Sequence, residues 1–294
     1  MTTTDASSEI KNIITRALEQ NPENKEIIKA FAPLVIRQRE LVEQISLKQL
    51  DYSKISKEKL KAGVPVSRQI DLLLPEDSLK EIALSLASAV QEGMPKLSED
   101  LAKIQSLIQE GKIDPADYFQ STVNGEVQAV DSWTKGLKIS PSNASFLMSL
   151  VSRVVLEIRA REIMATLGAF DWEKGYCPIC GEFPSIALIE EEGGKRFLHC
   201  SSCGQDWRFT RISCPYCEKE TRKDMEYFYV ENKTQEAAFV CDQCKKYLVT
   251  LYRAGKLFAR DMDISAISLI HMDIIMQGKG YEPMSICIWN VLSS

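Results

Sequence analysis

The chain has 294 residues, of which 45% are hydrophobic and 26% are charged, and its formal net charge is −5. This composition is sufficient to bury one large core or two moderate ones, and it excludes a largely disordered chain. The negative net charge argues against a protein that binds nucleic acid mainly by neutralising phosphates, so no nucleic-acid partner is expected.

Neither the start of the chain nor its longest apolar stretch has the features of a targeting or membrane segment. Residues 1–8 lack the basic start and the apolar run that an export signal needs. The stretch from Ile264 to Met276 is interrupted by polar residues and is shorter than the roughly 20 residues that cross a bilayer. We therefore expect a cytoplasmic protein without a membrane span.

Residues 1–172 are predicted to form a helical domain, because apolar residues recur there at steps of three and four. The clearest helix runs from Pro141 to Leu167, with Ser140 as its cap, a proline in its first turn and Gly168 at its end. Shorter amphipathic helices are predicted at residues 8–19, 33–50, 77–91 and 98–110. The segment 64–75 has two prolines and no clear period, so we interpret it as a connection on the bundle, or a binding loop.

Residues 173–294 are predicted to form a second domain, in which short β-rich runs replace the helical period. Strands are expected at residues 183–190, 196–200, 206–212, 227–230, 237–240 and 247–252. Turn residues at 191–194 and 231–234 lie between strands and between cysteine pairs, which predicts a duplicated hairpin. A helix is expected at residues 263–277 before a short extended tail.

Eight of the nine cysteines form four CxxC pairs, and no cysteine precedes residue 177. In a reducing compartment such pairs favour metal binding over disulfides. A two-residue gap lets one tight turn direct both sulfurs at one ion, and two such turns complete a tetrahedron. The predicted metal ligands are Cys177, Cys180, Cys200, Cys203, Cys214, Cys217, Cys241 and Cys244.

The order of the pairs favours two sequential sites, because 19 residues separate the first two pairs and 23 the last two, enough for one hairpin each. Interleaved pairing is the alternative. Gly181 and Gly204 follow two of the pairs and can take a left-handed backbone that turns amides toward the sulfurs. Four thiolates suit zinc or iron equally, and a filled tetrahedron leaves no position for a substrate. The expected cofactors are two tetrathiolate metal ions, zinc or iron.

Other reactive residues have less specific interpretations. The run from Cys214 to Cys217 also matches a glutaredoxin-type dithiol motif, but such a motif should open a helix, and the sequence that follows is charged and then strand-like. His199 is either a substitute ligand or a strand residue beside the site, and His271 fits a core or partner contact. Cys287 lies in an apolar run and is interpreted as a small buried hydrophobe.

The run from Arg196 to Cys217, with the pair at 177–180 before it and residues 241–248 after it, resembles the formate dehydrogenase accessory proteins (FdhE). The order and spacing of the pairs and the Trp207, Arg208 and Arg211 elements match, over about residues 176–280. The resemblance implies a cytoplasmic assembly factor with a helical and a rubredoxin-like metal-binding domain. Its implied partner is the catalytic subunit of formate dehydrogenase, and it is not itself an enzyme. Asp261 and Asp263 stand where the family usually has adjacent aspartates, and Asp273 fits the family better.

The predicted fold class is therefore α+β and multidomain: a helical N-terminal bundle plus a C-terminal double zinc-ribbon or rubredoxin-like metal-binding domain. The predicted function is that of a maturation chaperone which recognises an immature dehydrogenase subunit. Homodimer formation is left open. A redox-active iron-tetrathiolate protein is the alternative, and a nucleic-acid-binding ribbon is a third. The residues assigned to partner binding are Trp207, Arg208, Arg211, Tyr216, Asp261, Asp263 and Asp273, although Trp207 also suits packing of the hairpin and the arginines also suit compensation of thiolate charge.

Overall fold

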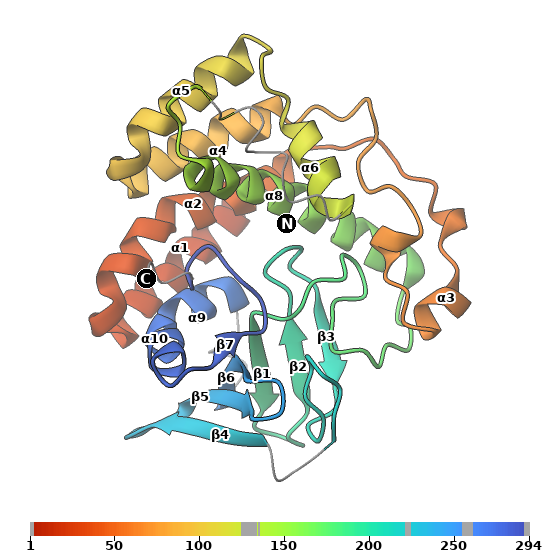
Figure 1. Cartoon of the computed structure of the whole chain (residues 1–294), viewed down its shortest axis with the longest axis vertical. Coiled ribbons are helices and arrows are strands. Elements are labelled where there is room, and N and C mark those ends of the chain that lie inside the picture. Colours follow the sequence, from red (N-terminus) through yellow and green to blue (C-terminus); the bar gives the residue numbers. More distant parts are fainter. Residues whose placement is uncertain (1–2, 125–133, 135, 221–224, 255–260, 291–294) are drawn as a thin grey trace.

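A computed structural model describes residues 3–124, 134, 136–220, 225–254 and 261–290. The first part of the chain is helical and the later part builds a sheet against the helices (Figure 1). The α+β architecture predicted from the sequence is confirmed. Among the described residues, no helix is both long and apolar enough to span a bilayer.

The helical part surrounds one long central helix, α8 (Pro141–Leu167), whose predicted bounds are confirmed. Most of its length is buried, because α2, α4, α5 and α6 pack around it. Even its charged residues Arg153, Glu157 and Arg159 are buried. The remaining helices of this part are α1 (Thr3–Gln20), α2 (Lys25–Gln44), α3 (Lys57–Lys61), α4 (Lys80–Gly93), α5 (Ser98–Gln109) and α6 (Pro115–Asn124).

The second helix differs from the one predicted at residues 33–50. It begins at Lys25, eight residues earlier, and ends at Gln44, so Pro33 lies inside the helix. A proline removes a backbone donor at that point. The end of α4 comes very close to α2 there, because a Cβ on Gly93 would lie 2.0 Å from the carbonyl oxygen of Ala30. Helices α3 and α6 were not predicted.

All strands of the later part belong to one seven-stranded sheet, in the order β3-β2-β1-β6-β5-β4, with β7 paired to β6. Strands β1 to β3 form one antiparallel ribbon and β4 to β6 the other, so the predicted duplication is confirmed. The ribbons meet where β1 and β6 pair in parallel, with Ile186 opposite Val249. The strands are β1 (Ile186–Glu190), β2 (Arg196–His199), β3 (Asp206–Phe209), β4 (Met225–Val230), β5 (Lys233–Cys241), β6 (Lys246–Ala254) and β7 (Glu282–Pro283).

The last helical stretch contains two helices rather than the single one predicted at residues 263–277. The chain breaks at Leu269 between α9 (Met262–Ser268) and α10 (Ile270–Gly278). Met272 and Met276 of α10 pack with Val240, Tyr247 and Val249 of the sheet, in a cluster separate from the main core. The main hydrophobic core is continuous from the helices to the cysteine-bearing turns.

Candidate metal centres

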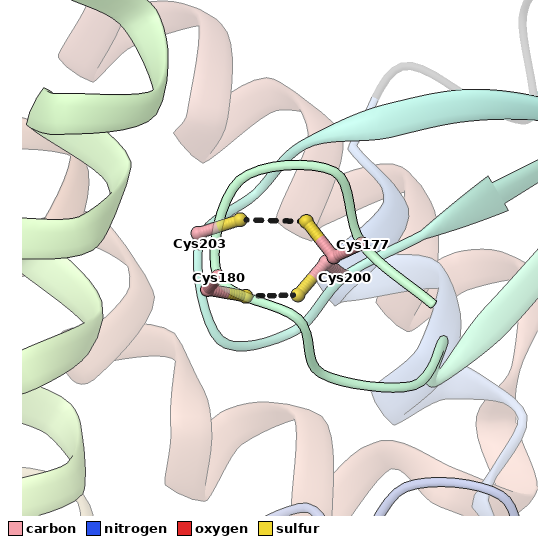
Figure 2. A group of neighbouring side chains, drawn as sticks. All are labelled: Cys177, Cys180, Cys200 and Cys203. Atoms are coloured by element: carbon pink, nitrogen blue, oxygen red, sulfur yellow. Dashed lines mark hydrogen bonds between the residues drawn. The ribbon is translucent and has the colours of Figure 1, made fainter. Parts of the chain in front are cut away.

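The first cluster contains the cysteines of the first two pairs (Figure 2). The sulfurs of Cys177 and Cys203 lie 3.4 Å apart, and those of Cys180 and Cys200 also lie 3.4 Å apart. The four side chains point toward one another from two turns, and all four sulfurs lie within 4.8 Å. Three of these cysteines are buried and Cys180 is partly buried.

The second cluster repeats the arrangement in the other ribbon. Sulfur distances are 3.8 Å from Cys214 to Cys244 and 3.8 Å from Cys217 to Cys241. The two groups are thus sequential, as the spacing predicted, and not interleaved. The clusters are neighbours in space, because a Cβ on Gly175, which precedes the first cluster, would meet the carbonyl oxygen of Pro215 in the second.

The donor sets fit a tetrahedral ion. Bonds of about 2.3 Å between sulfur and zinc give tetrahedron edges of about 3.8 Å. The second cluster has edges of this length, and the first is slightly tighter. Each group of four could therefore hold one ion with small shifts of its sulfurs. Thiolate ligands suit both zinc and iron.

All four turns share one backbone shape. In the first, the amide of Gly181 donates to the carbonyl of Cys177, and in the second that of Gly204 donates to Cys200. The residue after each pair has a positive φ, +87° at Gly181 and +73° at Gly204. In the second cluster Glu218 and Lys245, both at +56°, adopt the same conformation. A glycine after the pair therefore predicted the left-handed conformation in only two of the four turns. In the other two turns, a residue with a side chain adopts this conformation despite its backbone strain.

Backbone amides stabilise the sulfurs in these turns. The amide of Ile179 donates to the sulfur of Cys177 over 3.4 Å. Burial raises the pKa of Cys244 to about 11, and the amide of Lys246 opposes that rise. Amide hydrogen bonds favour the thiolate form that a metal needs, and they are typical of thiolate metal sites.

The helical part makes direct contact with the first cluster through the segment 64–75. The amides of Val66 and Ser67 donate to the carbonyls of Pro178 and Ile179, each over 2.9 Å. The hydroxyl of Ser67 donates to the carbonyl of Cys180 over 3.0 Å. The segment interpreted as a connection or binding loop is therefore bound to the turn between Cys177 and Cys180.

Helix α8 holds the other turn of the first cluster. The guanidinium of Arg153 donates to the carbonyl of Cys200 over 3.1 Å and to that of Ser201. A Cβ on Gly204 would lie 3.1 Å from Nη2 of Arg153. Glycine at position 204 thus serves both the left-handed turn and the close approach of this helix.

Arg153 belongs to a buried charge network that links helices α2, α8 and α9. Its Nη2 lies 2.6 Å from Asp263 and 3.2 Å from Glu157. Arg39 of α2 lies 2.8 Å from Glu157, 2.8 Å from Asp263 and 2.9 Å from Asp261. Because each buried carboxylate faces at least one guanidinium, the charges offset one another.

His199 extends this network into strand β2. Its two ring nitrogens lie 2.7 Å from Asp206 and 3.2 Å from Asp263. Burial by itself would lower the pKa of His199, but the hydrogen bonds to these carboxylates outweigh it and raise the pKa to about 10. Burial would raise the pKa of Asp263, but Arg153 and His199 hold it well below its usual range. His199 is thus a charged strand residue beside the cluster and not one of the four grouped ligands.

The four candidate contacts on the ribbon lie in different environments. Trp207 is buried, and its ring nitrogen donates to the carbonyl of Lys174 over 3.1 Å. Arg208 is exposed. The exposed Arg211 lies 6.0 Å from the ring of Tyr252, and the Lys246 ammonium lies 5.1 Å from the ring of the exposed Tyr216. Trp207 therefore packs the ribbon, while the other three side chains reach the surface.

The three candidate aspartates have internal partners. Asp261 accepts from the amide of Ile264 and begins α9, besides pairing with Arg39. Asp263 is buried in the charge network. Asp273 is buried and accepts from the hydroxyl of Tyr247 over 2.6 Å. Their assignment to partner binding stays a prediction.

Two further cysteine interpretations gain a structural context. Residues 218–220, directly after Cys217, are not helical, and the next described residues form strand β4, so the surroundings are not those of a dithiol enzyme. Cys287 is buried, and burial raises the pKa of its thiol to about 12. A neutral, buried thiol matches the small hydrophobe predicted from the sequence.

Arg39, Arg153 and Glu157 are site residues that the sequence analysis missed. Arg153 and Glu157 lie four residues apart on α8 and interrupt an otherwise apolar stretch. Two oppositely charged residues four positions apart, within an otherwise apolar helix, could have indicated a buried ion pair. Arg39 had none, because its carboxylate partners Asp261 and Asp263 are more than 220 residues away in the chain.

Comparison with known proteins gives consistent matches. A family model described as "FdhE, central domain" matches residues 176–211. A protein FdhE homolog of Enterobacter sp. strain 638 is 24% identical over 265 residues, covering 87% of this chain and 79% of the homolog. An FdhE homolog of Aquifex aeolicus is 32% identical over 115 residues, 37% of this chain and 40% of the homolog.

A third homolog, from Yersinia enterocolitica, is 27% identical over 152 residues, 51% of this chain and 48% of the homolog. The chain thus spans about half the length of these last two relatives. The crystal structure of the FdhE protein from Pseudomonas aeruginosa has the same fold, with a TM-score of 0.63 and 18% identity over 97% of this chain and 95% of that one.

The fold and the site together define an α+β protein with two tetracysteine clusters, one of them held between a helical bundle and a sheet. The sequence and fold matches all point to one family within this class. The chain is similar to the FdhE proteins, in its central segment by the family model and over most of its length by fold.

Proposed function

We propose that this chain is a cytoplasmic accessory protein that supports the maturation of formate dehydrogenase by binding its catalytic subunit. Similarity to the FdhE proteins is the observation that carries this proposal. A binding role, without turnover, agrees with the site. Four cysteines per cluster would fill the coordination sphere of an ion and leave no position for a substrate.

The eight clustered cysteines would hold two ions, Cys177, Cys180, Cys200 and Cys203 around one and Cys214, Cys217, Cys241 and Cys244 around the other. Each ion would supply cross-links that fix a pair of turns which short strands alone hold poorly. The protein's own residues would then set the orientation of the first cluster. The hydroxyl of Ser67 donates to the carbonyl of Cys180 in one turn, and the guanidinium of Arg153 donates to the carbonyl of Cys200 in the other.

The exposed side chains of the ribbons would provide contacts to the subunit. Arg208, Arg211 and Tyr216 are accessible, and arginine and tyrosine are enriched at protein interfaces. The buried Trp207 would contribute indirectly, by fixing the position of the strand that carries Arg208.

Co-purification tests the partner. The tagged protein, expressed in a strain that lacks its own FdhE, should retain the catalytic subunit of formate dehydrogenase and restore formate oxidation. The double variant Arg208→Ala and Arg211→Ala should retain less subunit, whereas the exposed Lys11→Ala on α1 should behave as wild type. Intact dehydrogenase activity in the deletion strain, with no subunit retained by the wild-type protein, would defeat the proposal.

Metal analysis of the same material tests the ions. We expect two equivalents of zinc or iron. Iron in a tetrathiolate site changes its absorption when reduced under anaerobic conditions, whereas zinc is silent. A zinc-loaded protein that supports dehydrogenase activity would eliminate the redox-active iron function.

A further inference from the structure

A cavity of about 470 Å³ lies where helices α2 and α8, the first cluster and the C-terminal tail meet. Its volume is in the range of ligand pockets in proteins. Most of its wall is apolar, formed by side chains that include Phe31, Leu34, Val35, Leu150, Ile267 and Trp289. Cys180 and Ser201 bring both turns of the first cluster to the same wall.

One polar group in this wall is unsatisfied. Ser152 is only 6% exposed, and its hydroxyl has no hydrogen-bond partner among the described residues. A serine inside a helix commonly bonds to the carbonyl four residues earlier, which this hydroxyl does not do. Leaving a buried hydroxyl unpaired is costly, so the group indicates a missing partner in the cavity that it lines.

The charged side chains of the wall form balanced pairs. Arg153 and Asp263 lie 2.6 Å apart, and the partly exposed Arg68 and Glu182 add one cation and one anion. The tetrathiolate cluster that includes Cys180 would add negative charge when it holds a divalent ion. The cavity therefore disfavours a phosphate or a carboxylate, and its apolar wall favours an uncharged ligand.

A large apolar side chain at the rim of the cavity is exposed to solvent. Ile286 is 79% exposed although it lies beside the cavity, in the tail that also supplies Cys287 and Trp289 to the wall. An exposed apolar residue that continues an apolar pocket is typical of a surface that binds another polypeptide. A ligand that fills the cavity and also covers Ile286 must extend outward over the rim.

We propose that this cavity binds an extended, uncharged polypeptide segment, with one bulky apolar side chain inside and a backbone group hydrogen-bonded to Ser152. A peptide supplies both the apolar side chain and the polar partner that the wall lacks, and its chain continues over Ile286. That the segment belongs to a formate dehydrogenase subunit rests on the proposed function. Peptide binding itself does not.

The test uses the metal-loaded full-length protein and a capped, fluorescein-labelled peptide of alternating serine and leucine, followed by fluorescence anisotropy. The same peptide with asparagine in place of leucine is the ligand control. The variant Ile286→Asp should weaken binding at least tenfold. Its matched control is Ile274→Asp, since Ile274 is 52% exposed on α10 and does not line the cavity. That variant should bind as wild type.

Ser152→Ala separates ligand binding from a structural role. Removing an unpaired buried hydroxyl should leave the melting temperature unchanged or raise it. Affinity for the leucine peptide should nevertheless fall about threefold to tenfold. The inference is overturned if the leucine peptide does not bind, or if it binds the Ile286→Asp variant as tightly as the wild-type protein. It is also overturned if the small alcohol hexanol binds in the cavity and no peptide does.

Self-association through Ile286, seen as a dimer that Ile286→Asp dissociates without any peptide binding, would also overturn the inference. None of these results would contradict the proposed function, because co-purification with the dehydrogenase subunit is measured separately. Loss of co-purification with peptide binding retained would instead remove the proposed partner.

Discussion

Gly204 combines two constraints that a single methyl group would violate. Its φ of +73° costs any other residue about 1–2 kcal/mol. Its missing Cβ also makes room for Arg153, at 3.1 Å, and for Glu157, at 3.4 Å. Gly193 has the same φ of +73°, but a methyl group added there would meet nothing within 4 Å, so Gly193 carries only the first constraint.

Gly204→Ala should therefore destabilise the protein more than Gly193→Ala. We expect about 1–2 kcal/mol for Gly193→Ala from the backbone alone. Gly204→Ala should cost at least about 1 kcal/mol more, because the methyl group displaces Arg153 from the carbonyls of Cys200 and Ser201. Denaturant unfolding of metal-loaded protein measures both. Equal losses in the two variants would show that the contact with α8 carries no energy.

Asp273 makes stability depend on pH. Burial raises its pKa to about 6, although Tyr247, His271 and Asn290 favour the charged form and pull the pKa down. The thiol of Cys287 is the other titratable group that interacts with it. The carboxyl group ionises more easily in the unfolded chain, so stability should fall as pH rises from about 4 to about 6, by up to about 3 kcal/mol.

Asp273→Asn should abolish that fall while keeping an oxygen for the Tyr247 hydroxyl. The difference in unfolding free energy between variant and wild type should move in favour of the variant as pH rises from 5 to 7.5. Asp71→Asn, at an exposed position, is the matched control for the substitution itself. A difference for Asp273→Asn that stays constant across this range would contradict the expected ionisation.

At the scale of elements, Arg39 joins α2 to α8 and α9. Its guanidinium meets three carboxylates, those of Glu157, Asp261 and Asp263, whose side chains are 8–10% exposed. Arg39→Gln would leave Arg153, His199 and the more exposed Arg161 to offset the three carboxylates, and breaking a buried pair in this way costs about 3–5 kcal/mol.

Arg161→Gln is the matched control, because Arg161 also pairs with Glu157 but its side chain is 49% exposed, against 16% for Arg39. Its loss should cost less than about 1 kcal/mol. Thermal unfolding of both variants at neutral pH checks the contrast. Similar melting temperatures for the two variants would mean that the buried network does not hold the elements together.

The elements differ in how far the sequence predicted them. The helix from Pro141 to Leu167 and the sequential cysteine grouping follow from local signals: a proline, a glycine and a two-residue gap. The start of α2 was missed because Pro33 suggested a first turn, whereas packing against α4 keeps the helix continuous through it. The parallel pairing of β1 with β6 and the ion pairs of Arg39 join residues far apart in sequence, which no local pattern encodes.

At the scale of the whole molecule, the two clusters occupy unequal positions. The first is clamped by Ser67 and Arg153 of the helical part, and the second lies in the outer ribbon of β4, β5 and β6. If each cluster holds the ion proposed for it, loss of one ion should therefore have different consequences in the two places. Without the first ion, the turns that contact the helices would lose their cross-link, so the contact between bundle and sheet should weaken with them.

Cys180→Ser and Cys217→Ser test this asymmetry, since each removes a partly buried sulfur from one cluster. Each variant should hold one equivalent of metal, whereas Cys287→Ser should hold two, because Cys287 belongs to neither cluster. Amide hydrogen exchange should accelerate in β1, β2 and the middle of α8 for Cys180→Ser, but only in β4, β5 and β6 for Cys217→Ser. If both variants lost protection over the same residues, the parallel β1–β6 junction would couple the ribbons into one unfolding unit, and the first cluster would have no special role at the helix–sheet interface.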